Sequence, residues 1–253
     1  MAALSGKIAV VTGASRGIGK QTALRLAADG ATVVVHYRGN KALAEDVVRQ
    51  IEADGGSGFV LQSDLSDPAA PKQFYERLDP ELQRRFGSSL FDILVNNAGA
   101  GTRAVIEEVT EEALDETLQV DLKAPFFLIK YASPRLRDGG RIVNVSSMGT
   151  RVAYPEMAAY SPAKAGLEAL TLLLAAHFGP RGITVNAVLP GATATDMNPG
   201  AQDPVRSQQL AQTIALKRVG QPEDIADVIA FLVSDDGRWV TGQRIDTSGG
   251  QRI

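Results

Sequence analysis

The sequence contains no cysteine and only two histidines among its 253 residues. The lack of cysteine excludes disulfides, thiolate catalysis and zinc sites built on thiolates. The two histidines, His36 and His177, lie far apart in the chain and have no pattern of ligand residues around them. We therefore expect no metal site.

Long apolar runs and strong charge of one sign are also missing. No run approaches the ~18 apolar residues needed to span a bilayer, and residues 1–11 form too short a segment for a signal peptide. The formal net charge is only -3, and no basic cluster indicates nucleic acid or an anionic membrane surface. We expect a cytoplasmic protein that binds neither nucleic acid nor a membrane.

The chain does contain a repeating pattern of short apolar segments and longer helical segments. The expected strands cover residues 7–12, 32–36, 58–62, 91–95, 141–146, 183–188 and 243–246. The expected helices cover residues 17–29, 40–54, 68–86, 111–136, 158–178 and 222–234. This alternation predicts an α/β fold with a single Rossmann-type, doubly wound parallel sheet of about seven strands and helices on both faces.

No proline- or serine-rich linker divides the chain, so we expect one dinucleotide-binding and catalytic domain over residues 1–253. Two segments break the alternating pattern, residues 99–108 after the fourth strand and residues 191–213 after the sixth. Both follow the carboxyl ends of strands, where open α/β sheets bind ligands. A connection as long as 191–213 predicts a lid or a substrate loop.

A glycine-rich turn, TGASRGIG at residues 12–19, joins the first strand to the first helix. Gly13 permits a tight turn, Gly17 lets the backbone approach a phosphate, and Gly19 permits close packing of the helix. The spacing lacks the lysine of a P-loop, which disfavours ATP and GTP. The N–H groups and dipole at the helix start favour an anion, so we expect a dinucleotide. A tight structural turn is the alternative.

The residues expected near the adenosine ribose carry positive charge. NAD-binding folds have an acidic residue about 20 positions beyond the glycine turn, but the second strand here ends in HYRGN at residues 36–40. Arg38, together with Arg16 in the turn, suits a 2′-phosphate that a carboxylate would repel. We expect the cofactor NADP(H); two solvated surface arginines are the alternative.

Tyr160 and Lys164 lie four residues apart, which places both on one face of a helix. A phenol with an ordinary pKa of about 10 becomes a usable acid or base when a fixed cation stabilises the phenolate. Such pairs often arise by chance, so an exposed amphipathic helix is the alternative. Pro162 is tolerated in a first helical turn, which predicts that the helix begins just before or at Tyr160.

Several motifs, in this order, resemble the short-chain dehydrogenase/reductase family over residues 7–250. They are the turn 12–19, the run Asn96-Asn97-Ala98-Gly99, Ser147, the Tyr160 and Lys164 pair, and Pro190-Gly191. The likeness is greatest to the 3-oxoacyl-carrier-protein reductase-like branch and includes residues 218–224 and 240–242. The resemblance implies one Rossmann domain, a nicotinamide cofactor, and hydride transfer to a carbonyl or from an alcohol.

The resemblance also implies four catalytic residues. Ser147 would hydrogen-bond the substrate carbonyl, although a serine at a strand end can equally satisfy backbone groups. Tyr160 would donate a proton to the developing alkoxide, and Lys164 would lower the Tyr160 pKa and hold the nicotinamide ribose. The family usually has asparagine where this chain has Asp121. Asp121 could pair with Lys164, which would raise the lysine pKa and weaken its effect on Tyr160.

Besides Tyr160 and Lys164, the cofactor contacts implied by the resemblance are Gly13, Ser15, Arg16, Gly17, Ile18, Gly19, Arg38, Asp64, Leu65, Asn96, Ala98, Gly99, Pro190, Gly191, Thr193 and Thr195. Asp64 is expected at the adenine and Thr195 at the carboxamide or a phosphate. Asn97 is expected to bond within the sheet. An apolar substrate pocket, or alternatively ordinary packing, is expected of residues 100–104, Met148, Tyr154, Met157 and Met197.

We therefore predict an NADPH-dependent carbonyl reductase acting on a ketone or aldehyde, with Tyr160 as general acid. Carrier-protein reductases have a basic residue before the fifth strand, where this chain has Asp138. A free small carbonyl compound is thus favoured over a carrier-bound 3-oxoacyl thioester. An oxidative alcohol, sugar or steroid dehydrogenase and a non-catalytic NADPH-binding protein remain alternatives. The family implies a homotetramer or homodimer, and Trp239 is expected to pack, at a subunit contact.

Overall fold

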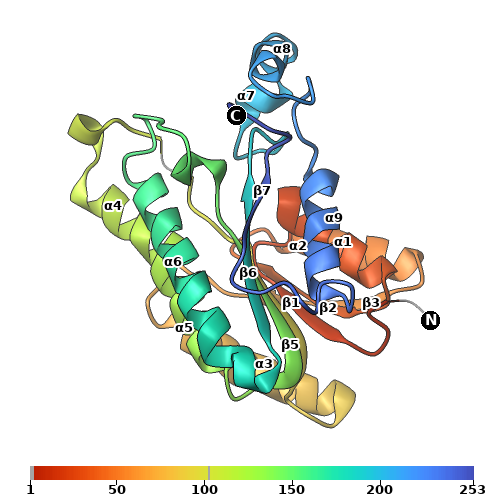
Figure 1. The fold of residues 1–253 in the computed structure, drawn as a ribbon. Coiled ribbons are helices and arrows are strands. Elements are labelled where there is room, and N and C mark those ends of the chain that lie inside the picture. Colours follow the sequence, from red (N-terminus) through yellow and green to blue (C-terminus); the bar gives the residue numbers. More distant parts are fainter. Residues whose placement is uncertain (1–2, 102) are drawn as a thin grey trace.

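The structure is a computed structural model that describes residues 3–101 and 103–253. Seven parallel strands form one sheet in the order β3-β2-β1-β4-β5-β6-β7 (Figure 1). The strands are β1 (Ile8–Val11), β2 (Thr32–Tyr37), β3 (Ser57–Gln62), β4 (Phe91–Asn96), β5 (Leu136–Val145), β6 (Thr184–Pro190) and β7 (Arg244–Thr247). The α-helices are α1 (Gly17–Ala28), α2 (Lys41–Ala53), α3 (Ala70–Phe86), α4 (Glu111–Leu118), α5 (Ala124–Ala132), α6 (Tyr160–Phe178), α7 (Pro199–Gln202), α8 (Pro204–Gln212) and α9 (Pro222–Val233).

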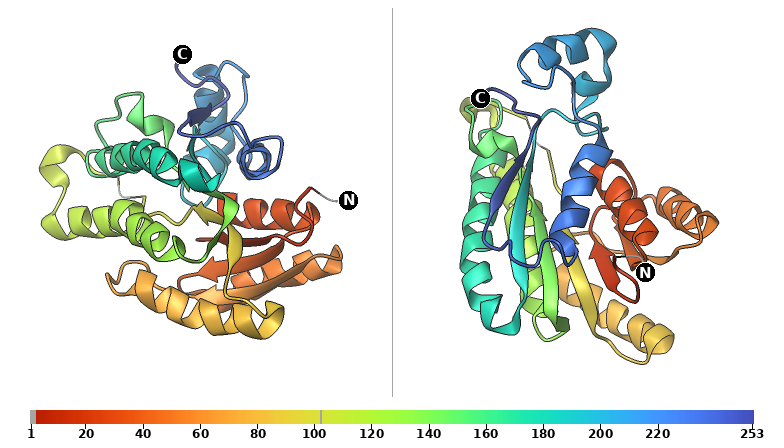
Figure 2. Two further views of the ribbon diagram at one scale, coloured as in Figure 1. Left: turned by 60° about the horizontal axis from the view of Figure 1, so that its bottom comes forward. Right: turned by 45° about the vertical axis from the view of Figure 1, so that its right-hand side comes forward.

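Helices cover both faces of the sheet, as Figure 2 shows from two further sides. Successive residues of a strand point to opposite faces. In β1, Ala9 and Val11 therefore join the core cluster that includes residues of α1, α2 and α9. Ile8 and Val10 join the cluster under α3 and α5. Strands buried on both faces read as continuous apolar runs, and the predicted doubly wound fold is confirmed.

The expected helix over residues 111–136 is wrong in its interior and at its end. It is divided by a π-helical turn, Gln119–Lys123, between α4 and α5, and the chain enters β5 at Leu136. Pro125 lacks the N–H that a continuous α-helix would use there, and wide turns of this kind occur mostly at functional sites. The expected start of α6 at Tyr160 is confirmed.

Residues 191–213, which lack an obvious helical pattern, contain the short helices α7 and α8. These helices extend beyond the carboxyl ends of β6 and β7 (Figure 1). The Asp203 side chain accepts a hydrogen bond from Arg206 N at 2.8 Å, which caps α8 directly before Pro204 at its first position. The predicted loop is therefore a small helical subdomain beside the ligand-binding edge of the sheet.

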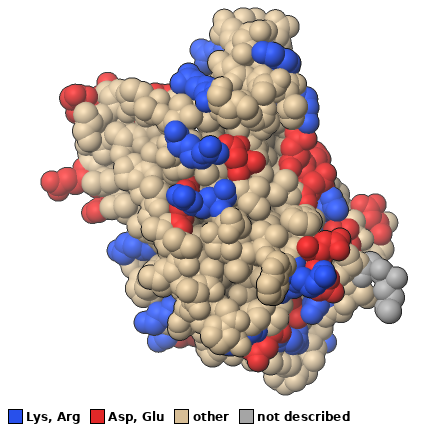
Figure 3. Space-filling model, in the orientation of Figure 1, with Lys and Arg blue, Asp and Glu red and all other residues tan. Residues whose placement is uncertain are grey.

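The surface carries interspersed charges rather than a field of one sign over the face in Figure 3. Trp239 is 96% exposed in the single subunit, so its packing at a subunit contact stays a prediction. Among the described residues, no helix is both long and apolar enough to cross a membrane.

Candidate active site

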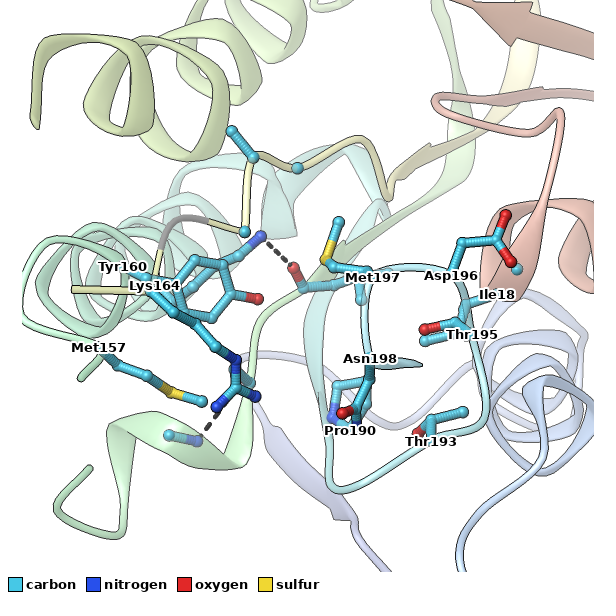
Figure 4. A pocket seen from close by; sticks show the side chains of 18 of the residues that line it. Ile18, Met157, Tyr160, Lys164, Pro190, Thr193, Thr195, Asp196, Met197 and Asn198 are labelled. Carbon is cyan, nitrogen blue, oxygen red and sulfur yellow. Dashed lines mark hydrogen bonds between the residues drawn. The ribbon is translucent and has the colours of Figure 1, made fainter. Parts of the chain in front are cut away.

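A cavity of about 1030 Å³ opens at the carboxyl ends of the strands. Its walls come from the β1–α1 turn, the ends of β4, β5 and β6, the first turn of α6, and residues 191–213. Tyr160 and Lys164 lie on one side of it, and Ile18 and Thr195 lie on the other (Figure 4). The cavity thus joins segments that are far apart in the sequence and that carry most of the predicted site residues.

Most of the predicted residues line this cavity. The set comprises Ser147, Tyr160, Lys164, Gly13, Ser15, Arg16, Gly17, Ile18, Arg38, Asp64, Leu65, Ala98, Gly99, Pro190, Gly191, Thr193 and Thr195. The expected substrate walls are also there: Ala100, Gly101, Arg103, Met148, Tyr154, Met157 and Met197. Thr102, inside the expected wall 100–104, lies outside the described residues.

Three predicted catalytic or cofactor residues, Gly19, Asn96 and Asp121, lie behind the lining instead of in it, and Ala104 of the expected wall 100–104 does not line the cavity either. A Cβ on Gly19 would sit 2.3 Å from the Gly13 oxygen, so Gly19 serves the close packing of α1. Asn96 is 2% exposed and donates to Asn144 Oδ1 at 2.8 Å within the sheet. Its neighbour Asn97 lines the cavity, and the Asn97 side-chain amide donates a hydrogen bond to the Thr12 backbone oxygen at 2.8 Å.

The glycine turn has the backbone geometry of an anion cradle. Gly13 and Gly17 have φ of +63° and +56°, a region that favours glycine. A Cβ on Gly13 would also lie 3.0 Å from Ala98 Cα. The Arg16 side chain makes no capping hydrogen bond at the start of α1, which leaves the N–H groups of the first turn available to a phosphate.

His36 fastens this turn to the end of β3. Its Nδ1 accepts a hydrogen bond from Gly13 N at 3.0 Å, and its Nε2 lies 3.0 Å from the Ser63 oxygen. Because a neutral imidazole has one donor and one acceptor, the proton belongs on Nε2. Burial lowers the His36 pKa to about 4, although the hydrogen bond to the Ser63 oxygen acts to raise it. His36 is therefore a neutral bridge at working pH.

Arg16 and Arg38 flank the same end of the cavity. Arg38 Nε lies 3.1 Å from Asp64 Oδ2, and Arg16 NH1 lies 3.6 Å from Asp196 Oδ2. The arginine side chains are 62% and 68% exposed, and exposed pairs of this kind are weak. Either guanidinium can therefore exchange its carboxylate for a phosphate.

The three catalytic candidates meet where β5 ends and α6 begins. The Ser147 hydroxyl accepts a hydrogen bond from Gly149 N at 3.1 Å, and Ser147 lines the cavity together with Tyr160. Tyr160 is the first residue of α6, and Lys164 follows one turn later, its Nζ 5.5 Å from the Tyr160 ring centroid. Lys164 Nζ donates to the Val145 oxygen at 2.9 Å. The ammonium is thus fixed between the end of β5 and the phenol.

Asp121 lies behind Lys164, in the π-helical turn. Its Oδ1 is 2.9 Å from Lys164 Nζ, and its Oδ2 accepts a hydrogen bond from Ala100 N at 3.1 Å. The Asp121 side chain is 0% exposed and that of Lys164 is 4% exposed. Burial alone would lower the Lys164 pKa. The negative charge of Asp121 and the Tyr160 phenol raise the pKa by more than burial lowers it, so the net shift is upward. Lys164 therefore carries its positive charge at neutral pH.

The balance at Tyr160 differs from the simple expectation of a lowered pKa. Burial raises the Tyr160 pKa, Lys164 lowers it, Asp121 raises it again, and the hydrogen bond with Ser147 lowers it. The net shift is upward. The cation acts in the expected direction but does not outweigh the burial, so this phenol holds its proton at neutral pH. Such a group suits the delivery of a proton.

Sequence reasoning missed Glu168, a buried carboxylate two turns beyond Tyr160. Its Oε1 accepts hydrogen bonds from Ser146 Oγ at 2.6 Å and Thr150 Oγ1 at 2.7 Å. Its Oε2 lies 3.6 Å from Arg244 NH1 on β7. Glu168 thereby ties both sides of Ser147 to α6. Its spacing of i+4 from Lys164 was the available signal, because that spacing puts it on the same helical face.

Comparison with known proteins identifies the family of this chain. A family model described as enoyl-(acyl carrier protein) reductase matches residues 13–252. The chain belongs to the short-chain dehydrogenase/reductase family. It is 41% identical over 246 residues to the 3-oxoacyl-[acyl-carrier-protein] reductase FabG of Staphylococcus aureus, covering 96% of this chain and 97% of FabG.

Two solved ketoreductases are similar over almost the whole chain. The reductase LugOII, which catalyses keto-reduction at C1 during lugdunomycin biosynthesis, is 46% identical with a TM-score of 0.95, covering 99% of this chain and 100% of LugOII. The angucycline C-6 ketoreductase LanV, with bound NADP, is 44% identical with a TM-score of 0.95, covering 99% of this chain and 97% of LanV. The predicted family, its oxidoreductase class and the cofactor NADP(H) are confirmed, and this short-chain reductase performs NADPH-dependent carbonyl reduction.

Proposed function

We propose that Tyr160 is the general acid of the reduction, with Ser147 polarising the carbonyl and Lys164 stabilising the phenolate that remains. The observation that carries this proposal is that Ser147, Tyr160 and Lys164 line one cavity, with the buried Lys164 ammonium 5.5 Å from the centroid of the Tyr160 ring. Asp121 acts as a positioning residue, because it touches Lys164 and lies behind the cavity lining.

NADPH, when bound, supplies the hydride to the carbonyl carbon. The hydroxyls of Ser147 and Tyr160 share the carbonyl oxygen, and Tyr160 delivers its proton as negative charge develops there. The fixed charge of Lys164 then stabilises the phenolate. The Val145 oxygen and Asp121 keep that ammonium from turning away.

The residues around the glycine turn suit the cofactor. The uncapped first turn of α1 and the positive φ of Gly13 and Gly17 form a cradle for the diphosphate. Arg16 and Arg38 hold the 2′-phosphate, since a guanidinium binds such a group through two parallel hydrogen bonds. Asp64 bonds the adenine, and Thr195, beside Gly17, reaches the nicotinamide carboxamide or a phosphate.

Replacement of Tyr160 by phenylalanine tests the proton donor. The variant should lose about 10²–10⁴ in kcat, the usual contribution of a positioned acid, while the dissociation constant of NADPH, measured by its fluorescence, stays within a few-fold. Tyr131→Phe, on α5 away from the cavity, is the matched control. Wild-type turnover by Tyr160→Phe would show that another group donates the proton.

The substrate we propose is a ketone on a free molecule rather than on a carrier protein. The cavity volume, its methionine and tyrosine walls and the similarity to LugOII and LanV support this choice. Asp138, which the resemblance aligns with a basic residue of carrier-protein reductases, lies inside β5 rather than before it, and its Oδ1 is 2.8 Å from Arg181 Nε. Comparing NADPH oxidation with cyclic ketones and with a carrier-bound 3-oxoacyl thioester tests it.

We further propose that residues 1–253 act as one unit, with 191–213 as the substrate loop, and that the protein assembles as a homotetramer or homodimer in the cytoplasm. Leu172 and Leu173 on α6 are 64% and 63% exposed, and Phe126 on α5 is 47% exposed. A second copy covering this apolar face accounts for their exposure. Light scattering of Leu172→Lys, which should shift to smaller species, tests the assembly, and cell fractionation tests the location.

A further inference from the structure

The C-terminal tail returns to the cavity and forms part of its wall. The Gln251 side chain accepts a hydrogen bond from Ala192 N at 2.8 Å, and Arg252 N donates to the Thr213 oxygen at 2.8 Å. Arg252 has φ of +54°, which is uncommon for a residue with a side chain. The tail is thus fastened to both ends of the substrate loop, in a backbone conformation that the surrounding contacts maintain.

The side chain of Arg252 is held over an aromatic ring. Its Cζ lies 4.8 Å from the centroid of Tyr154, and both residues line the cavity. The Tyr154 hydroxyl is 3.4 Å from Met148 Sδ, next to Ser147. Stacking on a tyrosine orients a guanidinium without neutralising it. The charge therefore stays available at the substrate side of the catalytic serine.

Arg252 has no acidic partner, whereas three other arginines of the cavity each have one. Arg16, Arg38 and Arg103 pair with Asp196, Asp64 and Glu156 respectively. Within residues 3–101 and 103–253, no Asp or Glu carboxylate lies within 4.0 Å of the Arg252 guanidinium. The cavity thus holds an oriented cation whose charge is not matched by the protein.

A second arginine without an acidic partner lies on the same wall. Arg206, Leu210 and Thr213 of the α8 segment line the cavity at a spacing of i, i+4 and i+7, so they share one helical face. Thr213, at the end of that face, receives the hydrogen bond from Arg252 N. Arg206 has no carboxylate within ion-pair distance in the described part of the chain.

We propose that Arg252, assisted by Arg206, forms a subsite for an oxyanion of the substrate, a carboxylate or a phosphate at the end remote from the reacting ketone. The inference rests on the proposed ketone reduction and narrows its substrate class to acidic ketones. An oriented guanidinium binds carboxylate and phosphate alike through paired hydrogen bonds. The chemistry is therefore shared, and the source of the oxyanion is decided by experiment.

The test compares acidic and neutral ketones in wild type and in Arg252→Ala. One arm uses 4-oxopentanoate, 6-oxoheptanoate and their ethyl esters, and the other uses acetoacetyl-coenzyme A and acetoacetyl-N-acetylcysteamine. Arg252→Ala should lower kcat/KM about tenfold or more for the charged member of one arm and leave its neutral partner within twofold. Loss in the first arm identifies a carboxylate, and loss in the second identifies a phosphate.

Three further variants define the outcome. Arg252→Lys should retain part of the preference, since it keeps charge without the planar fork, and Arg206→Ala should show a smaller loss of the same kind. Arg49→Ala, on α2 outside the cavity, is the control. Equal effects of Arg252→Ala on charged and neutral members, or none on either, would overturn the subsite. Turnover of the neutral ketones would still stand, so that result is distinct from failure of the reductase proposal.

Discussion

Replacing Asp121 by asparagine, the residue usual in the family, should destabilise this protein. Two donors face the carboxylate, Lys164 Nζ at Oδ1 and Ala100 N at Oδ2. An asparagine offers a single oxygen, so its NH₂ group must face one of the donors. A buried donor left unmatched costs about 1–3 kcal/mol, which corresponds to a fall in Tm of about 2–12 °C in a chain of this size. Asp121→Leu, which leaves the ammonium unpaired, should cost about 3–5 kcal/mol.

The same change should also alter the pH dependence of reduction. Asp121 raises the Tyr160 pKa while Lys164 lowers it, so Asp121→Asn lowers that pKa as long as Lys164 remains protonated. Reduction needs the protonated phenol and falls as the pH rises through the Tyr160 pKa. The alkaline limb of kcat should therefore move to lower pH in the variant.

The assay combines thermal unfolding with kcat for a ketone, measured from neutral pH up to the highest pH at which the protein stays folded, because the wild-type Tyr160 pKa is raised above its ordinary value. Asp115→Asn, an exposed acid on α4, is the control and should change neither measurement. An unchanged Tm together with an alkaline limb that stays in place or moves to higher pH would refute the account of this ion pair.

Three other predictions follow from the site. Arg38→Asp should raise the KM for NADPH about ten- to a hundredfold and favour NADH. Asp64 and Glu116 lie 3.1 and 3.7 Å from the Arg38 guanidinium, so the new carboxylate would join two others that repel a 2′-phosphate. An unchanged cofactor preference would contradict the ribose assignment. The free energy of unfolding should fall by about 3 kcal/mol as the pH drops from 6.5 to 4, since burial lowers the His36 pKa to about 4, and His36→Asn should lose this dependence in denaturant titrations. Glu168→Leu should lower kcat more than it raises the KM for NADPH, because it frees the segment around Ser147, and Glu168→Gln should retain more of the rate; equal loss in both variants would indicate general misfolding.

Local rules were sufficient for the sheet and for the residues nearest the chemistry. The apolar runs identified all seven strands, and Pro162 fixed the start of α6 at Tyr160. The glycine spacing identified the cofactor turn because each glycine answers a local backbone requirement. Asp203 followed by Pro204 is a helix-start signal that was open to use and would have revealed α8.

The remaining features depend on contacts between distant segments. Nothing near Arg252 in the sequence indicates that the tail meets Tyr154, and the exposure of Trp239 depends on which surfaces the subunit leaves uncovered. The pairing of Asp121 with Lys164 was expected from the likeness to the family, whereas the wide turn that presents it was not. Contacts between residues that are distant in the sequence cannot be predicted from the spacing of apolar residues along the chain.

The π-helical turn at Gln119–Lys123 makes the catalytic face sensitive to chain length. Such a turn contains one residue more than an α-helical turn, and each residue rotates a helix by about 100°. Deleting a single amino acid there would restore regular winding and swing the carboxylate of Asp121 around the axis, away from the ammonium. A deletion that makes the helix regular would thus break the ion pair between Asp121 and Lys164. The extra residue of the π-helical turn is what lets the segment between α4 and α5 place Asp121 beside the ammonium.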